Sequence, residues 1–254
     1  MLTITQHVLV VLVLAVLSTH AAKDLPSYFP RCFRNDPKLN ECLLKAADQV
    51  RPYLKKGVPE LNVQSIDPIT IPEIQLQQGT QALNFKALLI NTTIKGLSDY
   101  TIDKFDFDVP NLQFFCSGWV DKLELDGKYN VSGKILIAPI EGDGTFTASV
   151  GKSKLEVYQK VKVIKKNGLD YVTPVHTNST IDVGDPKVHL EGLFRNNKEL
   201  NKATNDVITD NINVLFEDLK PVIEKIVTNL IEKLVLEALE NQVPFDKLYA
   251  IKKN

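Results

Sequence analysis

Side chains that could carry out catalysis are few in this chain of 254 residues and are not arranged for it. Beyond the first 22 residues it has two histidines, His176 and His189, thirteen residues apart in segments that are predicted as strand or loop. That spacing is not typical of a zinc site, and two ordinary surface histidines explain it better. The sequence therefore predicts no metal site.

Motifs for nucleophilic and phosphate chemistry are incomplete. The stretch Gly151–Lys154 lacks the second glycine of a G-x-S-x-G nucleophile elbow. The Gly142–Gly144 turn is followed by neither GK[ST] nor a helix, which excludes a phosphate-binding loop. The carboxylates of Asp106 and Asp108 alternate with apolar residues, as expected on the solvated face of a strand. We predict no catalytic residue and no cofactor, and hence a protein that is not an enzyme.

Charge gives no sign of a nucleic-acid partner. Thirty Lys and Arg residues are interspersed with 31 Asp and Glu residues, for a net charge of −1. A protein that binds nucleic acid or an anionic membrane would concentrate basic residues on one face. The sequence predicts an ordinary solvated surface.

Cysteines and glycosylation motifs suit an exported protein. Three cysteines leave one unpaired, and Cys32 and Cys42 are close enough to close a small loop at the start of the first helix. A disulfide between them is favoured. Cys116 lies in the apolar segment 112–117, where a buried, inert thiol is expected. Sequons stand at three positions, of which we expect at least one to carry glycan: Asn91, Asn130 and Asn178.

Residues 1–22 are predicted to be a secretory signal peptide. Val8–Leu17 is an unbroken apolar core, and small or polar residues follow it up to Ala22. A membrane anchor is the alternative, but ten apolar residues are too short for the ~20 that span a bilayer. We expect an extracellular, secreted chain without integral membrane association, whose residues 23–254 form one domain.

The element that must organise the fold is the stretch from about Asn205 to Glu240. It is predicted to be one long helix, kinked near 217–221 by Pro221 and ended by Asn241 and Pro244. Successive apolar doublets, four residues apart, turn by about 40° around the helix, so they wind along it. The doublets are Val222/Ile223, Ile226/Val227, Leu230/Ile231, Leu234/Val235 and Ala238/Leu239. A winding apolar stripe is best buried by a structure that wraps around the helix.

The rest of the chain supplies such a wrapping. A short helix is predicted over 36–57, and from 74 to 194 apolar and polar residues alternate with period two between glycine-containing turns. This pattern predicts antiparallel strands with one apolar face. We expect the α+β class: an elongated single domain in which a strongly curved antiparallel sheet wraps a long C-terminal helix.

A surplus of apolar side chains in such a fold favours a cavity for a lipophilic ligand. Ten residues are candidates for lining it, although each could equally be core packing: Phe105, Phe107, Phe114, Trp119, Phe146, Phe194, Phe216, Ile223, Val227 and Leu230. We predict a carrier of a hydrophobic small molecule. The alternative is an extracellular protein with a filled core that acts through a receptor or another protein partner.

Several motifs together resemble one family. They are Leu25-Pro26 with Phe29 and Cys32, Gly57-Val58-Pro59-Glu60-Leu61, Leu125-Asp126-Gly127-Lys128-Tyr129, Pro139-Ile140-Glu141-Gly142-Asp143-Gly144, Phe216-Glu217-Asp218-Leu219-Lys220-Pro221 and Val243-Pro244-Phe245-Asp246-Lys247-Leu248-Tyr249. In order and spacing the mature chain resembles the insect takeout and haemolymph juvenile-hormone-binding family. The resemblance implies a superhelical, TULIP-like lipid-binding fold, a tunnel for a long-chain lipid or terpenoid, and a Cys32–Cys42 disulfide.

Two departures favour the takeout branch of that family. Hormone-binding members have a second disulfide from the sheet to the long helix, yet neither 173–180 nor 205–238 contains a cysteine here. Those members also place a tyrosine hydroxyl in the pocket, where this chain has Phe146. Phenylalanine cannot donate a hydrogen bond to an ester or epoxide oxygen. The resemblance therefore implies a lipophilic ligand without implying juvenile hormone itself.

Overall fold

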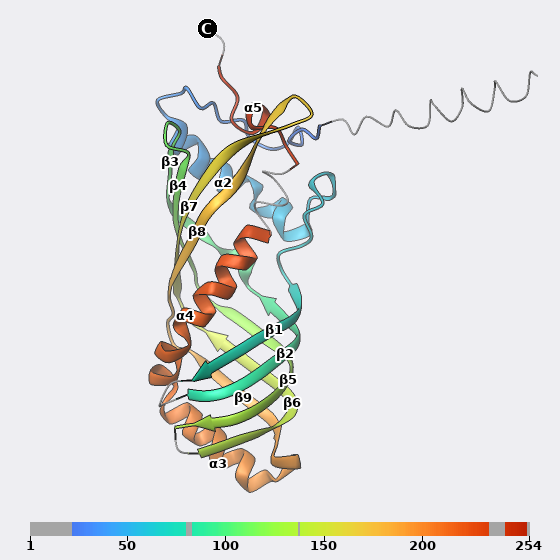
Figure 1. Cartoon of the computed structure of the whole chain (residues 1–254), viewed down its shortest axis with the longest axis vertical. Helices are drawn as coiled ribbons and strands as arrows, with labels where there is room; N and C mark the ends of the chain where they lie inside the picture. Colours follow the sequence, from blue (N-terminus) through green and yellow to red (C-terminus); the bar gives the residue numbers. More distant parts are fainter. Residues whose placement is uncertain (1–21, 80–82, 137, 234–241, 253–254) are drawn as a thin grey trace, which may run out of the picture.

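The computed structural model describes residues 22–79, 83–136, 138–233 and 242–252. It is an elongated molecule in which two twisted antiparallel sheets run along the length and helices lie against them (Figure 1). The predicted signal peptide lies outside the described residues except for Ala22, and so do residues 234–240 at the end of the predicted long helix.

The nine strands form two sheets with only antiparallel neighbours. One sheet has the order β1-β2-β5-β6-β9 and the other β3-β4-β7-β8. The first comprises β1 (Ile69–Gly79), β2 (Leu83–Lys95), β5 (Leu123–Ile135), β6 (Ala138–Val150) and β9 (Lys187–Leu193). The second comprises β3 (Thr101–Asp108), β4 (Gln113–Val120), β7 (Ser153–Lys166) and β8 (Leu169–Asp182). The predicted fold class is confirmed, and the structure adds that the chain alternates between two sheets.

Four α-helices complete the described fold: α2 (Leu39–Lys56), α3 (Lys198–Asp210), α4 (Ile212–Ile231) and α5 (Phe245–Leu248). Three 3₁₀ turns join strands and helices: η1 (Pro59–Leu61), η2 (Leu97–Asp99) and η3 (Phe194–Asn196). The helix predicted over 36–57 corresponds to α2, which ends at Gly57, where φ is +89°.

The structure corrects the prediction of one uninterrupted helix over 205–240. Helical structure begins earlier, at Lys198, and breaks at Asn211, whose φ of −117° and ψ of 13° lie outside the helical range. The side chain of Asn211 donates to the carbonyl of Val207, a local bond by which asparagine competes with the helix. α4 then continues through Pro221, where the predicted kink stays a prediction, and the helix break at Asn211 was not predicted.

Buried apolar side chains gather at the two ends of the molecule. The α3-end cluster joins the five-stranded sheet to α3 and the first turn of α4, and its largest members are Phe85, Tyr129, Phe146, Leu193, Ile208 and Leu215. The α5-end cluster joins the four-stranded sheet to α2 and α5, through Leu39, Phe107, Phe114, Val161, Val172 and Phe245. Val243 packs with Phe29, Val58 and Leu61 in a third, smaller cluster.

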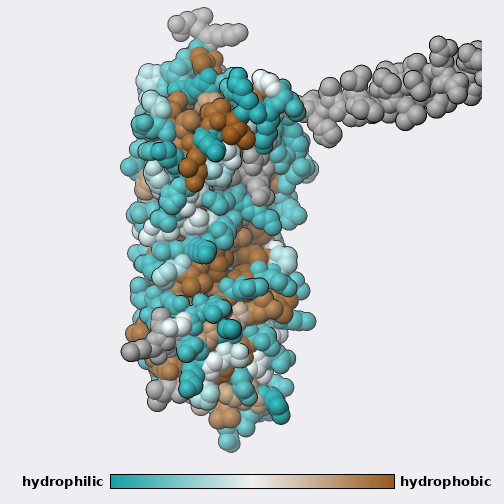
Figure 2. All heavy atoms as spheres, in the orientation of Figure 1, coloured by the Kyte–Doolittle hydropathy of each residue, from teal (hydrophilic) through white to brown (hydrophobic). Residues whose placement is uncertain are grey.

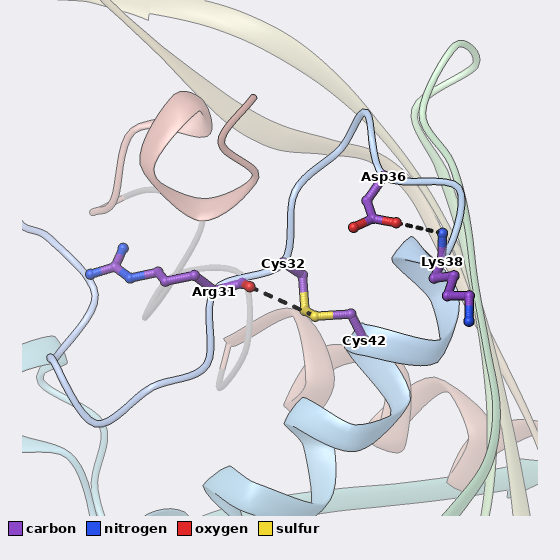
Figure 3. Close-up of a disulfide and its surroundings, with 5 residues drawn as sticks. All are labelled: Arg31, Cys32, Asp36, Lys38 and Cys42. Carbon is purple, nitrogen blue, oxygen red and sulfur yellow. Dashed lines mark hydrogen bonds between the residues drawn. A yellow bond between two sulfur atoms is a disulfide. The ribbon is translucent and has the colours of Figure 1, made fainter. Parts of the chain in front are cut away.

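The predicted disulfide is confirmed. Cys32 and Cys42 are joined with a Cα–Cα distance of 5.8 Å, and the bond ties the entering chain to the first turns of α2 (Figure 3). The carboxylate of Asp36 accepts a hydrogen bond from the Lys38 amide, 2.8 Å away, in the turn that precedes α2.

Removal of this disulfide should destabilise the α5-end of the molecule. The bond closes a loop between residues ten apart, and the loss of that restraint from the unfolded chain corresponds to about 2–3 kcal/mol. We expect the double variant Cys32→Ala/Cys42→Ala to lose about that much unfolding free energy in a urea titration. Cys116→Ser is the matched control and should change it much less. Equal stability of the double variant and the native chain would contradict this role.

Candidate functional site

Helix α4 lies between the edge strands of the two sheets and is fastened to both. On the β8 side, the Ser179 hydroxyl lies 2.9 Å from the Glu224 carbonyl and 2.6 Å from the Thr228 hydroxyl. The Glu224 carboxylate accepts a hydrogen bond of 3.1 Å from the Ile181 amide of the same strand. On the β1 side, the Gln78 side chain donates to the Asp218 carbonyl. Figure 1 shows α4 crossing the middle of the molecule in this position.

The exposure pattern of α4 shows that much of its inner side is only half-buried. One stripe, four residues apart, faces solvent: Asn213, Glu217, Pro221, Lys225, Asn229 and Lys233. Half a turn away stand Leu215, Leu219, Ile223, Val227 and Ile231. In a close-packed core all five would be fully buried, yet only Leu215 is, with 4% of its surface exposed. The inner side of α4 beyond its first turn is therefore only half-buried, although Leu219 packs against the α3-end cluster.

The walls opposite α4 show the same property. Their inward apolar side chains are half-buried: Ile74, Leu76, Leu89, Leu125 and Ala148 on the five-stranded sheet, and Phe105, Cys116, Leu155 and Val157 on the other. Of these, Leu76, Leu89, Leu125 and Ala148 also pack against the α3-end cluster, and Phe105 packs against the α5-end cluster. We call the region bordered by these half-buried side chains and by α4 the central hollow, and propose below that it is open to a ligand. Hydrophobic residues also reach the surface in the middle of the molecule, where α4 and β1 lie side by side (Figure 2). The hollow is apolar and lies between the two packed end clusters.

The predicted lining residues fall into separate groups. Ile223, Val227, Leu230 and Phe216 are half-buried on α4. Phe105 is half-buried on the inward face of β3, where it also packs against the α5-end cluster. These five border the central hollow or lie on the helix that closes it. Their role in binding a ligand stays a prediction.

Four other predicted residues belong to the end clusters. Phe107 and Phe114 stack with ring centroids 4.0 Å apart, and Tyr249 lies 4.8 Å from Phe107. Phe146 is 5% exposed in the α3-end cluster, where its ring occupies the space that a side chain at Gly127 would need. Phe194 packs beside that cluster. The structure thus places these four in packing rather than in the hollow.

Trp119 is on the outer face of its sheet. Its indole N–H donates to the Asp103 carboxylate at 3.0 Å, and the ammonium groups of Lys152 and Lys154 lie 5.0 and 5.7 Å from its ring. Side chains alternate along β4, so the inward position at this level is that of Gly118. Trp119 therefore does not border the hollow.

Two polar residues of the interior were missed from the sequence. Gln159 and Thr177 face each other across β7 and β8 on the inward face and are 8% and 9% exposed. The Gln159 Nε2 and Thr177 Oγ1 atoms have no hydrogen-bond partner. The available signal was the alternation Val157, Gln159, Val161, in which a polar residue occupies an apolar position.

Other kinds of site find little support among the described residues. No group of three His, Cys, Asp or Glu side chains in them could hold a metal ion, and none of their helices is long and apolar enough to cross a membrane. An open groove of about 390 Å³ beside β5, β6 and β9 is lined largely by polar and charged residues, including Lys122, Glu124, Lys187 and His189. The predicted glycosylation sites Asn91, Asn130 and Asn178 are all exposed on strands.

The free thiol of Cys116 borders the hollow in a non-reactive state. It shares a row of the inward face with Phe105, Val157 and Ser179. Burial, with a smaller contribution from the charge of Asp103, raises the pKa of the Cys116 thiol to about 11. The thiol is therefore protonated at neutral pH, which agrees with the inert cysteine predicted from the sequence.

Comparison with known proteins gives consistent matches. The sequence model of the family described as "Haemolymph juvenile hormone binding protein (JHBP)" matches residues 8–250. The circadian clock-controlled protein daywake of Drosophila yakuba is 26% identical over 239 residues, 90% of each chain, and its Drosophila melanogaster counterpart is 25% identical over 237 residues, again 90% of each. The crystal structure of Epiphyas postvittana Takeout 1 is similar in fold, with a TM-score of 0.73 and 24% identity over 87% of this chain and 100% of that one.

The raised pKa of Cys116 predicts slow alkylation with a distinct pH dependence. At pH 8 a thiol of pKa about 11 carries about 100-fold less thiolate than one of the usual pKa of 9.0. Iodoacetamide should therefore label Cys116 about 100-fold more slowly in the folded protein than in urea. The folded rate should keep rising up to about pH 11, whereas the unfolded rate levels off above pH 9. Equal rates at pH 8 would contradict the raised pKa of the Cys116 thiol.

Proposed function

Because the chain belongs to the haemolymph juvenile hormone binding protein family, we propose that it is a carrier that holds a hydrophobic small molecule in the central hollow. The observation that supports this most is the half-buried inner side of α4 at Leu219, Ile223 and Val227. Apolar side chains that face unfilled, water-sized space gain free energy when an apolar ligand fills it.

The size of the ligand follows from the energetics of burial. Each buried methylene contributes about 0.8 kcal/mol, whereas association costs an estimated 4–15 kcal/mol in lost translational and rotational freedom. A molecule of a few carbons cannot offset that cost by apolar contact alone. We therefore propose a long-chain lipid or a terpenoid, with Phe105, Phe216, Ile223, Val227 and Leu230 in its binding site.

The carrier is proposed to be secreted and non-enzymatic. The apolar stretch Val8–Leu17 supports export through cleavage of residues 1–22, with 23–254 as the mature domain. The exposed sequon asparagines support glycosylation of the exported chain. The incomplete catalytic motifs support binding without turnover.

Native mass spectrometry of protein secreted from insect cells tests this function. We expect a species heavier than the glycosylated polypeptide by one ligand, which organic extraction recovers as a lipophile. Protein stripped by extraction should take up one fatty alcohol or terpenoid per chain. The proposal would be contradicted by protein that is secreted without a ligand and then binds none of a panel of fatty acids, fatty alcohols, quinones and terpenoids. Such a result would favour the filled-core protein that acts through a partner.

A bulky substitution on the inner side of α4 should separate a hollow from a filled core. Val227→Trp places an indole in the hollow, so we expect at least a tenfold loss of ligand affinity with less than about 1 kcal/mol lost from the unfolding free energy. In a filled core the same change would overpack the site and cost about 1–3 kcal/mol. Val214→Trp is the matched control, because Val214 is on the same helix with 58% of its surface exposed. A control variant that loses affinity equally would overturn the assignment of the site.

A further inference from the structure

The inward face of the four-stranded sheet carries one polar pair at the boundary between the central hollow and the α5-end cluster. Gln159 is directly opposite Phe114 on one side and Thr177 on the other. Along β7 its inward neighbours are Val161, buried in the α5-end cluster, and Val157, half-buried beside the hollow. Gln159 and Thr177 therefore lie between the fully buried and the half-buried side chains of this face.

The orientation of this pair toward α4 follows from its neighbour on β8. Ser179 is two residues from Thr177 and so lies on the same face of the strand. Its hydroxyl contacts the Thr228 hydroxyl of α4 at 2.6 Å. Ser179 has its partners in α4, whereas Thr177 and Gln159 have none.

Two unpartnered polar atoms side by side in an apolar interior are costly. A buried donor or acceptor without a partner loses its hydrogen bonds to water and gains nothing in return. The Nε2 atom of Gln159 is a donor, and the Thr177 hydroxyl can donate or accept. Both atoms are enclosed in this structure, so a ligand oxygen can bind them only after the side chains around them shift.

We propose that Gln159 and Thr177 bind a neutral oxygen of the ligand, in an alcohol, aldehyde, ketone or ester at the end of a long apolar chain. The proposal rests on the carrier function proposed above and assigns the polar end of the ligand within it. A carboxylate fits poorly, because the pair carries no charge and the ionisable side chain that contacts β8 beside it is the acidic Glu224. A pure hydrocarbon would leave both polar atoms unpartnered.

Ligands of equal chain length test this assignment. Dodecane, dodecan-1-ol and dodecanoate would be titrated against N-phenyl-1-naphthylamine bound to the full-length, delipidated protein. We would compare one ratio between variants, the dissociation constant of dodecane divided by that of dodecan-1-ol. The hydration of the two free ligands contributes equally to this ratio in every variant, so a change in the ratio reports a change in the binding site. Gln159→Leu and Thr177→Val should each lower this ratio about tenfold, the usual consequence of removing a site's hydrogen-bond partner. In the native protein dodecan-1-ol should bind more tightly than dodecanoate.

Thr147→Val is the matched control, since Thr147 is exposed on β6 and its change removes a hydroxyl outside the hollow. Its ratio should equal that of the native protein. Ligand-free Gln159→Leu should unfold at the same or a higher temperature, because it removes an unpartnered amide from an apolar site. A clear loss of thermal stability would mean that Gln159 has a structural partner and would overturn the proposal.

The remaining outcomes separate the two proposals. If none of the three ligands displaces the probe from the native protein, the carrier function itself fails. If the ligands bind but the ratio is unchanged in both Gln159→Leu and Thr177→Val, the carrier function is supported and the assignment of the ligand oxygen to Gln159 and Thr177 is wrong. Water would then occupy that position. Tighter binding of dodecanoate than of dodecan-1-ol would also overturn the anchor.

Discussion

The attachment of α4 to two sheet edges is the constraint on which the rest of the structure depends. Edge strands expose unpaired backbone groups, and here side chains of α4 bind one of those edges directly, as the Glu224 carboxylate does at the Ile181 amide. The Thr228 hydroxyl on the same side and the Asp218 carbonyl on the β1 side complete the attachment. Because hydrogen bonds along both flanks hold α4 in place, the helix does not depend on close packing of its inner side.

The two ends of the molecule are more closely packed than its middle. The α3-end cluster is reinforced by Asn201 and Asn205, whose side chains bond to the backbone of β9 at Leu190 and Leu193. The disulfide closes the other end. An unfilled apolar space costs packing energy, so the buried clusters must supply the stability of the fold. This division of roles links the architecture to the proposed carriage of a lipophile.

Much of the fold could be predicted from the sequence, because its signals are local. Period-two alternation indicated antiparallel strands, and the doublets at four-residue spacing indicated a long helix closed in by sheet. The division into two sheets and the helix break at Asn211 depend on tertiary contacts that no local pattern contains. The site was harder to predict, because side chains alternate between the two faces of a strand, and a shift of one residue decides which of them face the hollow. One residue separates inward Gly118 from outward Trp119, and large aromatics such as Phe114 were taken up by packing.

We propose that α4 encloses a ligand-sized apolar space. The decisive experiment is a crystal structure of the protein purified from insect cells without delipidation. We expect elongated electron density along the inner side of α4, past Leu219, Ile223 and Val227, with its polar end at Gln159 and Thr177. Close packing of α4 against both sheets, with no space for a chain of methylenes, would contradict it.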